Sequence, residues 1–121
     1  MSYALIERNY GDWDDLTFEE IEAQDPEGYR AWQENWIDYV IPNGESAAQT
    51  QARIDTFLEN VQKSNPQGNV LIMTHLGTAR HIISKLLGLT AEQSWLFALD
   101  NAKYALIETD GDKSVLKGLN L

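Results

Sequence analysis

His75 stands where one sequence pattern ends and another begins. The residues before it, 69–74, show no polar alternation, and a glycine and then an amphipathic pattern follow it. A run of this kind is typical of an interior, usually parallel, strand. Open α/β sheets bind ligands beyond the carboxyl ends of their strands, and the next helix directs free N–H groups toward the same place. The spacing therefore predicts an anion site at His75, but a histidine that merely closes a strand fits it equally well.

Glu7 is the second candidate for chemistry. It follows a short apolar piece, 4–6, and precedes a turn that contains Gly11 and then Trp13. A carboxyl group that is kept partly dry beside an aromatic ring can act as a general acid near neutral pH. A glutamate at the surface is the commoner case, and the residues by themselves leave both interpretations open.

Three helices that would position these residues carry clear signals. Thr17 and Glu20 form a capping box at the start of the first helix. Asp25 is the expected cap of a second short helix, which would extend to Trp36 with its aromatic residues on one face. A longer helix is predicted from Ser46 to about Lys63, because its apolar residues follow the helical spacing i, i+3, i+4 and i+7.

The remaining elements suggest an α/β sheet with helices on its faces. The strand predicted over 69–74 is followed by an amphipathic helix over 77–87. Thr90 and Gln93 form another capping box for a short helix. Two segments rich in β-forming residues flank the Asp-Gly-Asp sequence at 110–112, which predicts a hairpin.

The bulk composition narrows the range of functions. A chain of 121 residues without a linker predicts a single domain over 1–121. Its net charge of −10 argues against nucleic acid and anionic membranes as partners. The absence of cysteine excludes disulfides and thiolate metal sites. With no signal peptide or membrane-spanning pattern, we expect a cytoplasmic protein.

Four segments resemble the histidine phosphatase (phosphoglycerate mutase-like) family in order and spacing, and most of all its alpha-ribazole phosphatase-like branch. They cover nearly the whole chain and read LIERNYGDWDDLTFEEI, PNGES, LIMTHLGTAR and DNAKYALIE. The resemblance implies a three-layer α/β/α fold with a partly parallel sheet and helices on both faces, truncated here to its C-terminal portion. It also implies hydrolysis of phosphomonoesters, such as alpha-ribazole phosphate or another sugar phosphate, without a metal or other cofactor.

The resemblance also implies residue roles. In the family, a histidine in an Arg-His-Gly motif attacks the phosphoryl group, a second histidine and two arginines hold its oxygens, and a glutamate protonates the leaving group. His75 matches the second histidine and Glu7 the glutamate. The residues that match substrate-binding positions are Leu76 and Gly77, through their N–H groups, and Gly44, Glu45 and Ser46 in a loop near the substrate mouth. Asn43 and Leu76 each replace a glycine of the family pattern.

One departure from the family bears directly on activity. The chain contains no Arg-His-Gly, and its two histidines are His75 and His81. His81 falls within the predicted helix and fits a helix surface better than a nucleophile. A metal site made by the two histidines is also disfavoured, because their spacing of i, i+6 does not share a helix face and no third ligand is evident.

Three interpretations follow from the missing motif. The chain is a phosphatase with little or no activity by itself, a non-catalytic binding or oligomerisation module, or a phosphatase that another polypeptide completes. Each has a small phosphorylated molecule as its expected ligand, if it has one. The apolar strand would also have a bare edge, which invites pairing with another chain. We therefore expect a homodimer or higher oligomer.

Overall fold

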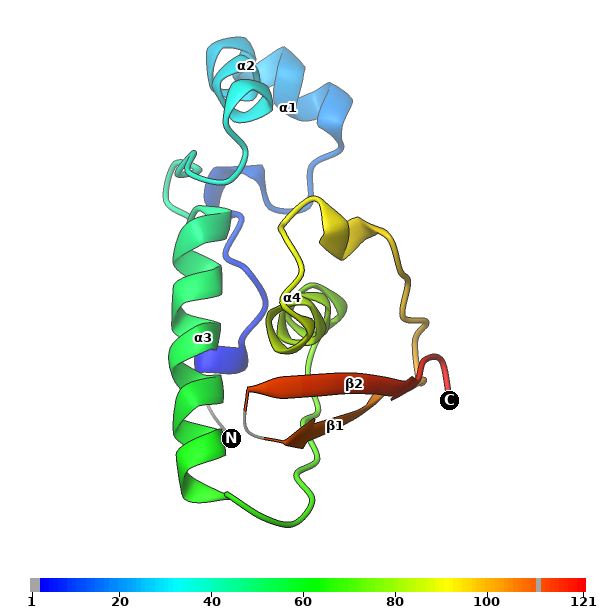
Figure 1. Cartoon of the computed structure of the whole chain (residues 1–121). Helices are drawn as coiled ribbons and strands as arrows, with labels where there is room; N and C mark the ends of the chain where they lie inside the picture. The colour runs from blue at the N-terminus through cyan, green and yellow to red at the C-terminus, as the bar shows by residue number, and fades with distance from the viewer. Residues whose placement is uncertain (1–2, 111) are drawn as a thin grey trace. The chain divides into compact units, whose positions relative to one another are not determined.

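A computed structural model describes residues 3–110 and 112–121 of the chain. The chain divides into two compact units (Figure 1). One unit comprises Arg8–Arg53, and the other joins Met1–Glu7 to Ile54–Leu121. Each unit has its own hydrophobic core. The expectation of a single domain stays a prediction.

The unit Arg8–Arg53 contains helices α1, Phe18–Gln24, and α2, Pro26–Glu34, and the first turns of α3. Thr17 and Glu20 form the predicted capping box of α1, and Asp25 caps α2 by accepting from the N–H of Gly28. Helix α2 ends before Trp36, so the expected continuation of its aromatic face to that residue is wrong. The hydrophobic core of the unit Arg8–Arg53 consists of Trp13, Ile21 and Ile41. The partly buried residues packed against this core are Leu16, Tyr29, Trp32 and Tyr39.

The other unit is built around α3, Ala47–Ser64, and α4, Leu76–Leu87, close to the predicted bounds of both helices. Ile54 and Leu58 of α3 pack with Ile82 of α4, which confirms the apolar faces read from the sequence. The predicted hairpin is formed by β1, Leu106–Asp110, and β2, Lys113–Gly118, while Gly111 in its turn lies outside the described residues. Short 3-10 helices cover Tyr3–Leu5 and Gln93–Trp95 in this unit, and Gly11–Trp13 in the unit Arg8–Arg53.

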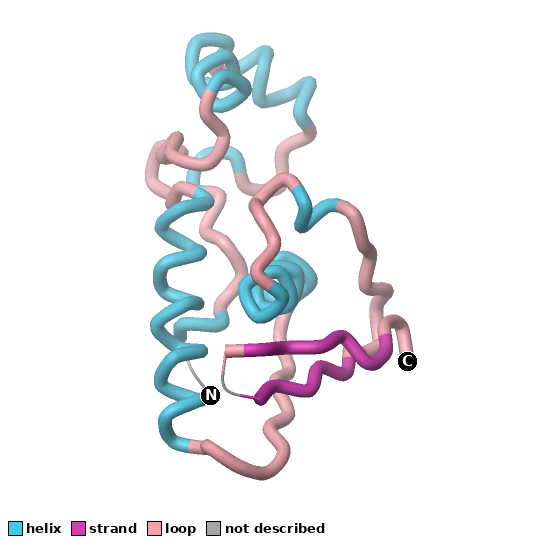
Figure 2. Tube along the Cα trace, in the orientation of Figure 1, coloured by secondary structure: helices cyan, strands magenta, loops and turns pink. Residues whose placement is uncertain are grey.

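The sheet differs from the predicted one. Within the described residues it has two strands, β1 and β2, which pair antiparallel. Residues 69–74 carry no strand and run as a loop before α4 (Figure 2). The expected interior parallel strand is therefore not formed, because a strand exists only through hydrogen bonds to a neighbour. The expectation that both its faces are buried is also wrong, since Leu71 and Met73 are exposed.

Helices packed with a hairpin confirm the α/β class. What the described residues lack is the parallel part of the expected sheet. No helix in the described part of the chain is both long enough and apolar enough to cross a membrane.

Candidate active site

Glu7 reaches the N-terminus of α4. The hydroxyl of Thr74 donates to the carbonyl of Leu5 at 3.0 Å, which holds the segment before Glu7 beside the segment before α4. A Cβ atom built on Gly77 would lie 2.9 Å from Oε1 of Glu7 and 3.5 Å from Oε2. The partly buried carboxylate thus lies directly against the first turn of α4, where a larger residue than glycine would displace it.

His75 is the N-cap residue of the same helix. Its backbone is extended, with φ −84° and ψ 160°, and its side chain makes no capping hydrogen bond. The ring is exposed. The first N–H groups of a helix have no partner within the helix and carry its positive dipole end. Glu7 therefore lies beside the helix end that His75 begins, and the roles of Glu7, His75, Leu76 and Gly77 in a site stay predictions.

Thr78 is a residue of this helix end that the sequence reasoning missed. It is 1% exposed, and its hydroxyl has no hydrogen-bond partner among the described residues. A buried hydroxyl without a partner costs roughly 1–3 kcal/mol. The signal available in the sequence was only its position in the first turn after His75, where a polar group can serve an anion.

The loop Gly44–Ser46 belongs to the other unit, where it crosses the segment 9–12 closely. The N–H of Glu45 donates to the carbonyl of Asn9, and the N–H of Asp12 donates to the carbonyl of Pro42, both at 2.9 Å. A Cβ atom on Gly44 would lie 2.6 Å from the carbonyl oxygen of Asn9. Packing thus explains the glycine at position 44, because any side chain there would clash with the backbone of Asn9.

Glu45 is held by contacts within the same unit. Its Oε1 pairs with Nη2 of Arg53 at 2.8 Å and accepts from the N–H of Asn9 at 2.9 Å. Partial burial by itself would raise the pKa of Glu45, but the hydrogen bonds from Arg53 and Asn9 outweigh it and hold this pKa below its ordinary value. Glu45 therefore has a structural role through its ion pair with Arg53. A role of Glu45 in binding substrate stays a prediction.

Ser46 has a structural role that the sequence reasoning missed. It is buried, its hydroxyl accepts from the N–H of Gln49, and the Gln49 side chain accepts from the N–H of Ser46. These reciprocal bonds form a capping box at the start of α3. The Ser-x-x-Gln spacing was the signal that could have revealed it. A contact between Ser46 and substrate stays a prediction.

Arg80 holds a loop against α4. Its Nη1 donates to the carbonyls of Ser94, at 2.8 Å, and Phe97, at 2.9 Å. Its guanidinium lies 4.4 Å from the ring centre of Trp95, within the range of a cation–π interaction. These contacts commit the charge of Arg80 to the fold.

The side chain of His81 also makes a contact within the fold. Its Nε2 lies 2.8 Å from Oδ1 of Asp55, whose other oxygen is 3.6 Å from Nζ of Lys85. The pairing joins α4 to α3 and supports the prediction that His81 is a helix residue and not a nucleophile. Among the described residues, no group of three or more His, Asp or Glu is placed to hold a metal.

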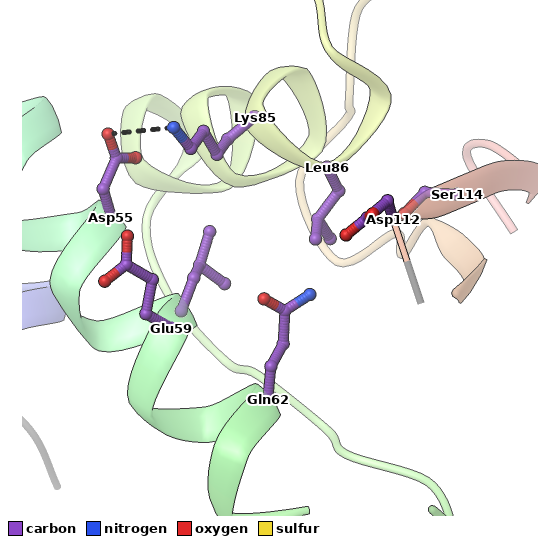
Figure 3. A pocket seen from close by; sticks show the side chains of 8 residues that line it. Asp55, Glu59, Gln62, Lys85, Leu86, Asp112 and Ser114 are labelled. Atoms are coloured by element: carbon purple, nitrogen blue, oxygen red, sulfur yellow. Dashed lines mark ion pairs between the residues drawn. The ribbon is translucent and has the colours of Figure 1, made fainter. Parts of the chain in front are cut away.

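A pocket lies beside this pair, between α3, α4 and the start of β2 (Figure 3). Lys85 stands ten residues beyond His75, a distance of ~15 Å along the helix at 1.5 Å per residue. The pocket is therefore separate from the cluster of Glu7 and His75. Its lining residues are Asp55, Leu58, Glu59, Gln62, Lys85, Leu86, Asp112 and Ser114.

Comparison with known proteins matches the chain to one family. The model of the histidine phosphatase superfamily (branch 1) matches residues 2–121. The chain is 32% identical over 117 residues to phosphoserine phosphatase 1 of Hydrogenobacter thermophilus, covering 97% of this chain and 56% of that protein. It is 28% identical over 116 residues to the adenosylcobalamin/alpha-ribazole phosphatase of Escherichia coli, covering 96% of this chain and 57% of that protein. The chain thus spans just over half the length of these curated relatives.

A solved structure shares the same fold. The alpha-ribazole phosphatase of Shigella flexneri superimposes with a TM-score of 0.87 at 29% sequence identity. The superposition covers 100% of this chain and 60% of the Shigella protein.

Proposed function

Because this chain belongs to the histidine phosphatase superfamily (branch 1), we propose that it carries part of a phosphomonoester-binding site. His75 and the N–H groups of Leu76 and Gly77 hold the phosphoryl oxygens in this proposal, and the carboxyl group of Glu7 serves the leaving-group oxygen. The substrate class is a small phosphorylated molecule, which is the class that the names of the relatives share.

The observation that carries the proposal is the position of Glu7. Its carboxylate lies against Gly77 in the first turn of α4, and His75 is the residue that begins that turn. A proton-transferring carboxyl group must stand within reach of the group that it serves. Here it stands beside N–H groups that favour a phosphate, so binding and proton transfer would occur at one place. The buried hydroxyl of Thr78 in the same turn adds a polar group.

We further propose that these 121 residues hydrolyse phosphomonoesters little or not at all by themselves. The two histidines are His75, assigned to binding, and His81, which is paired with Asp55. Arg53 and Arg80 are likewise committed to contacts within the fold. Phosphoryl transfer depends on positioning and charge stabilisation, and loss of a covalent nucleophile costs several orders of magnitude in rate. A non-catalytic binding module is the alternative.

Binding and turnover are tested separately. Inorganic phosphate is titrated into the full chain by calorimetry, and the variant His75→Ala is compared with His81→Ala as its matched control. We expect His75→Ala to weaken phosphate binding by about tenfold, which corresponds to ~1.4 kcal/mol. His81→Ala should leave the affinity unchanged, because Asp55 holds that ring elsewhere. Equal affinities of the wild type and His75→Ala would refute the site.

Turnover is measured with p-nitrophenyl phosphate. We expect no hydrolysis above background by the chain alone. Hydrolysis by the chain alone would contradict this proposal, and its loss in His75→Ala would show that the reaction takes place at the His75 site. The segment of the Escherichia coli relative that this chain does not match is then added as a separate polypeptide. Hydrolysis on mixing that requires Glu7 would favour a phosphatase over a non-catalytic module.

A further inference from the structure

The hydroxyl of Thr74 joins the two segments that carry Glu7 and His75. It donates to the carbonyl of Leu5 at 3.0 Å, although 69 positions separate the two residues. Thr74 directly precedes His75. Glu7 follows Leu5 by two positions, and two residues span at most ~7 Å of chain. The hydrogen bond therefore lies close to the backbone of both Glu7 and His75, within one compact unit.

Apolar packing brings these two segments together. Leu5 and Ile72 both pack against the same hydrophobic core, which consists of Ile54, Leu58 and Ile82. The side chains of Ile72 and Thr74 are partly buried and that of Met73 between them is exposed, so Thr74 lies on the same side as Ile72. Packing by itself allows apolar side chains to slide past one another, whereas a hydrogen bond requires a defined direction. The bond from Thr74 to Leu5 therefore fixes how the two segments are aligned.

The carboxyl group of Glu7 has little room for displacement. A Cβ atom on Gly77 would lie 2.9 Å from Oε1 of Glu7, so the carboxylate fills the space beside the first turn of α4. Phosphoryl transfer depends mostly on positioning, and a misplacement of about 1 Å can cost about 100-fold in rate. A shift of the segment that carries Glu7 would therefore remove its carboxyl group from a phosphate held at the start of α4.

We propose that Thr74 is a positioning residue of the phosphomonoester site, where its bond to Leu5 sets the carboxyl group of Glu7 beside the first turn of α4. The inference rests on the proposed function and adds to it a residue that does not touch the phosphoryl group. The N–H groups at the start of α4 are set by the helix itself. Loss of the Thr74 hydroxyl therefore leaves phosphate binding at these groups in place and displaces Glu7.

Two variants separate the hydroxyl of Thr74 from its shape. Thr74→Val keeps the branched side chain, which is stiff at χ1, and removes the hydrogen-bond donor. Thr74→Ser keeps the donor and removes the branch. A role that depends only on packing would be retained in Thr74→Val, whereas a role that depends on the bond to Leu5 would be retained in Thr74→Ser.

Nuclear magnetic resonance of the full chain follows Glu7 as inorganic phosphate is added. The carboxyl carbon of Glu7 is assigned by its absence in Glu7→Gln, and the amide of Gly77 reports binding. We expect Thr74→Val to reduce the phosphate-induced shift of the Glu7 carboxyl at saturation at least twofold, while the Gly77 amide responds as in the wild type. Thr74→Ser should restore the carboxyl shift. An unchanged carboxyl shift in Thr74→Val, or loss of the amide response as well, would overturn the inference.

A second measurement needs no phosphate. The nuclear Overhauser effect between the γ protons of Glu7 and the α protons of Gly77 reports their contact in the free chain. This signal should weaken at least twofold in Thr74→Val and return in Thr74→Ser. Equal signals in the wild type and Thr74→Val would show that the hydroxyl does not place Glu7. If phosphate fails to move the Gly77 amide of the wild type, the proposed function fails, and this signal still decides the role of Thr74.

Ser84→Ala is the matched control. The hydroxyl of Ser84 donates to the carbonyl of Arg80 at 2.8 Å, so this variant also removes a partly buried hydrogen bond from a hydroxyl to a carbonyl. Ser84 lies on α4 but nine residues beyond His75, which is ~13 Å along a helix at 1.5 Å per residue. We expect the Glu7 carboxyl shift to stay unchanged in Ser84→Ala. An equal loss in this variant would attribute the effect to general loosening and contradict a specific role of Thr74.

Discussion

The carboxylate of Glu7 occupies the space that a side chain on Gly77 would need, although seventy positions separate the two residues in the sequence. A Cβ atom on Gly77 would come within 2.9 Å of Oε1 of Glu7. Glycine is unfavourable inside a helix by about 1 kcal/mol relative to alanine. Its presence in the first turn of α4 is explained by the room that the carboxylate needs.

A double-mutant cycle tests this contact. We expect Gly77→Ala to stabilise the Glu7→Ala background more than the wild type, with a coupling of ~0.5–1 kcal/mol. In the wild type, the methyl group introduced by Gly77→Ala must displace the carboxylate of Glu7. In the Glu7→Ala background there is no carboxylate to displace, so the higher helix propensity of alanine stabilises the protein in full. The free energy of unfolding in urea measures both steps. Equal effects in the two backgrounds would show that the side chains do not compete for the same space.

The ion pair of Glu45 makes stability depend on pH. Because the pKa of Glu45 is lowered from 4.5 on folding, its contribution is fully present above pH 4.5 and is lost as the pH falls through the lower native pKa. We expect Glu45→Gln to cost roughly 1–2 kcal/mol at pH 7. Urea unfolding should show this cost shrinking as the pH falls from 5 to 3. The exposed Glu34, substituted by Gln, is the control and should change little at pH 7. A cost of Glu45→Gln that does not vary with pH would contradict the expectation.

Even a conservative substitution of Arg80 is expected to lower the stability of the protein. Arg80→Ala should cost about 1–3 kcal/mol, because two carbonyls lose a charged donor. Arg80→Lys should recover little of this, since an ammonium group lacks the planar fork that reaches both carbonyls and stacks on Trp95. Urea unfolding gives the cost, and faster exchange of the Leu96 amide reports the loosened loop. A wild-type stability for Arg80→Lys would show that charge alone suffices.

Ser46 separates a capping role from a substrate-binding role. Ser46→Ala should lower the free energy of unfolding by ~1 kcal/mol, and Ser46→Asp should retain most of the stability because it also caps. Thermal unfolding measures both variants, with Thr17→Ala as a second cap of known geometry. Phosphate affinity should stay unchanged in Ser46→Ala. Weaker phosphate binding at unchanged stability would instead place Ser46 in the site.

The local features of the fold were readable in the sequence. The caps at Thr17 and Asp25 and the apolar faces of α3 and α4 match the structure, because each depends on residues within a few positions of one another. Ser46 and Gln49 carried the same kind of signal. The strand expected over 69–74 failed for the opposite reason. Its apolar composition signalled burial, but a ladder also needs a partner strand, and the described residues supply none.

For the candidate site, the sequence by itself determined which residues could do chemistry. The motifs around Glu7 and His75 marked both residues and placed His75 at the start of a helix. Only the tertiary structure decided which charges the fold already uses. It set Glu7 against Gly77, and it committed Glu45 to Arg53 and Arg80 to two carbonyls. The physical reason is range, since helix and cap signals act over a few residues, whereas these contacts join residues that only packing brings together.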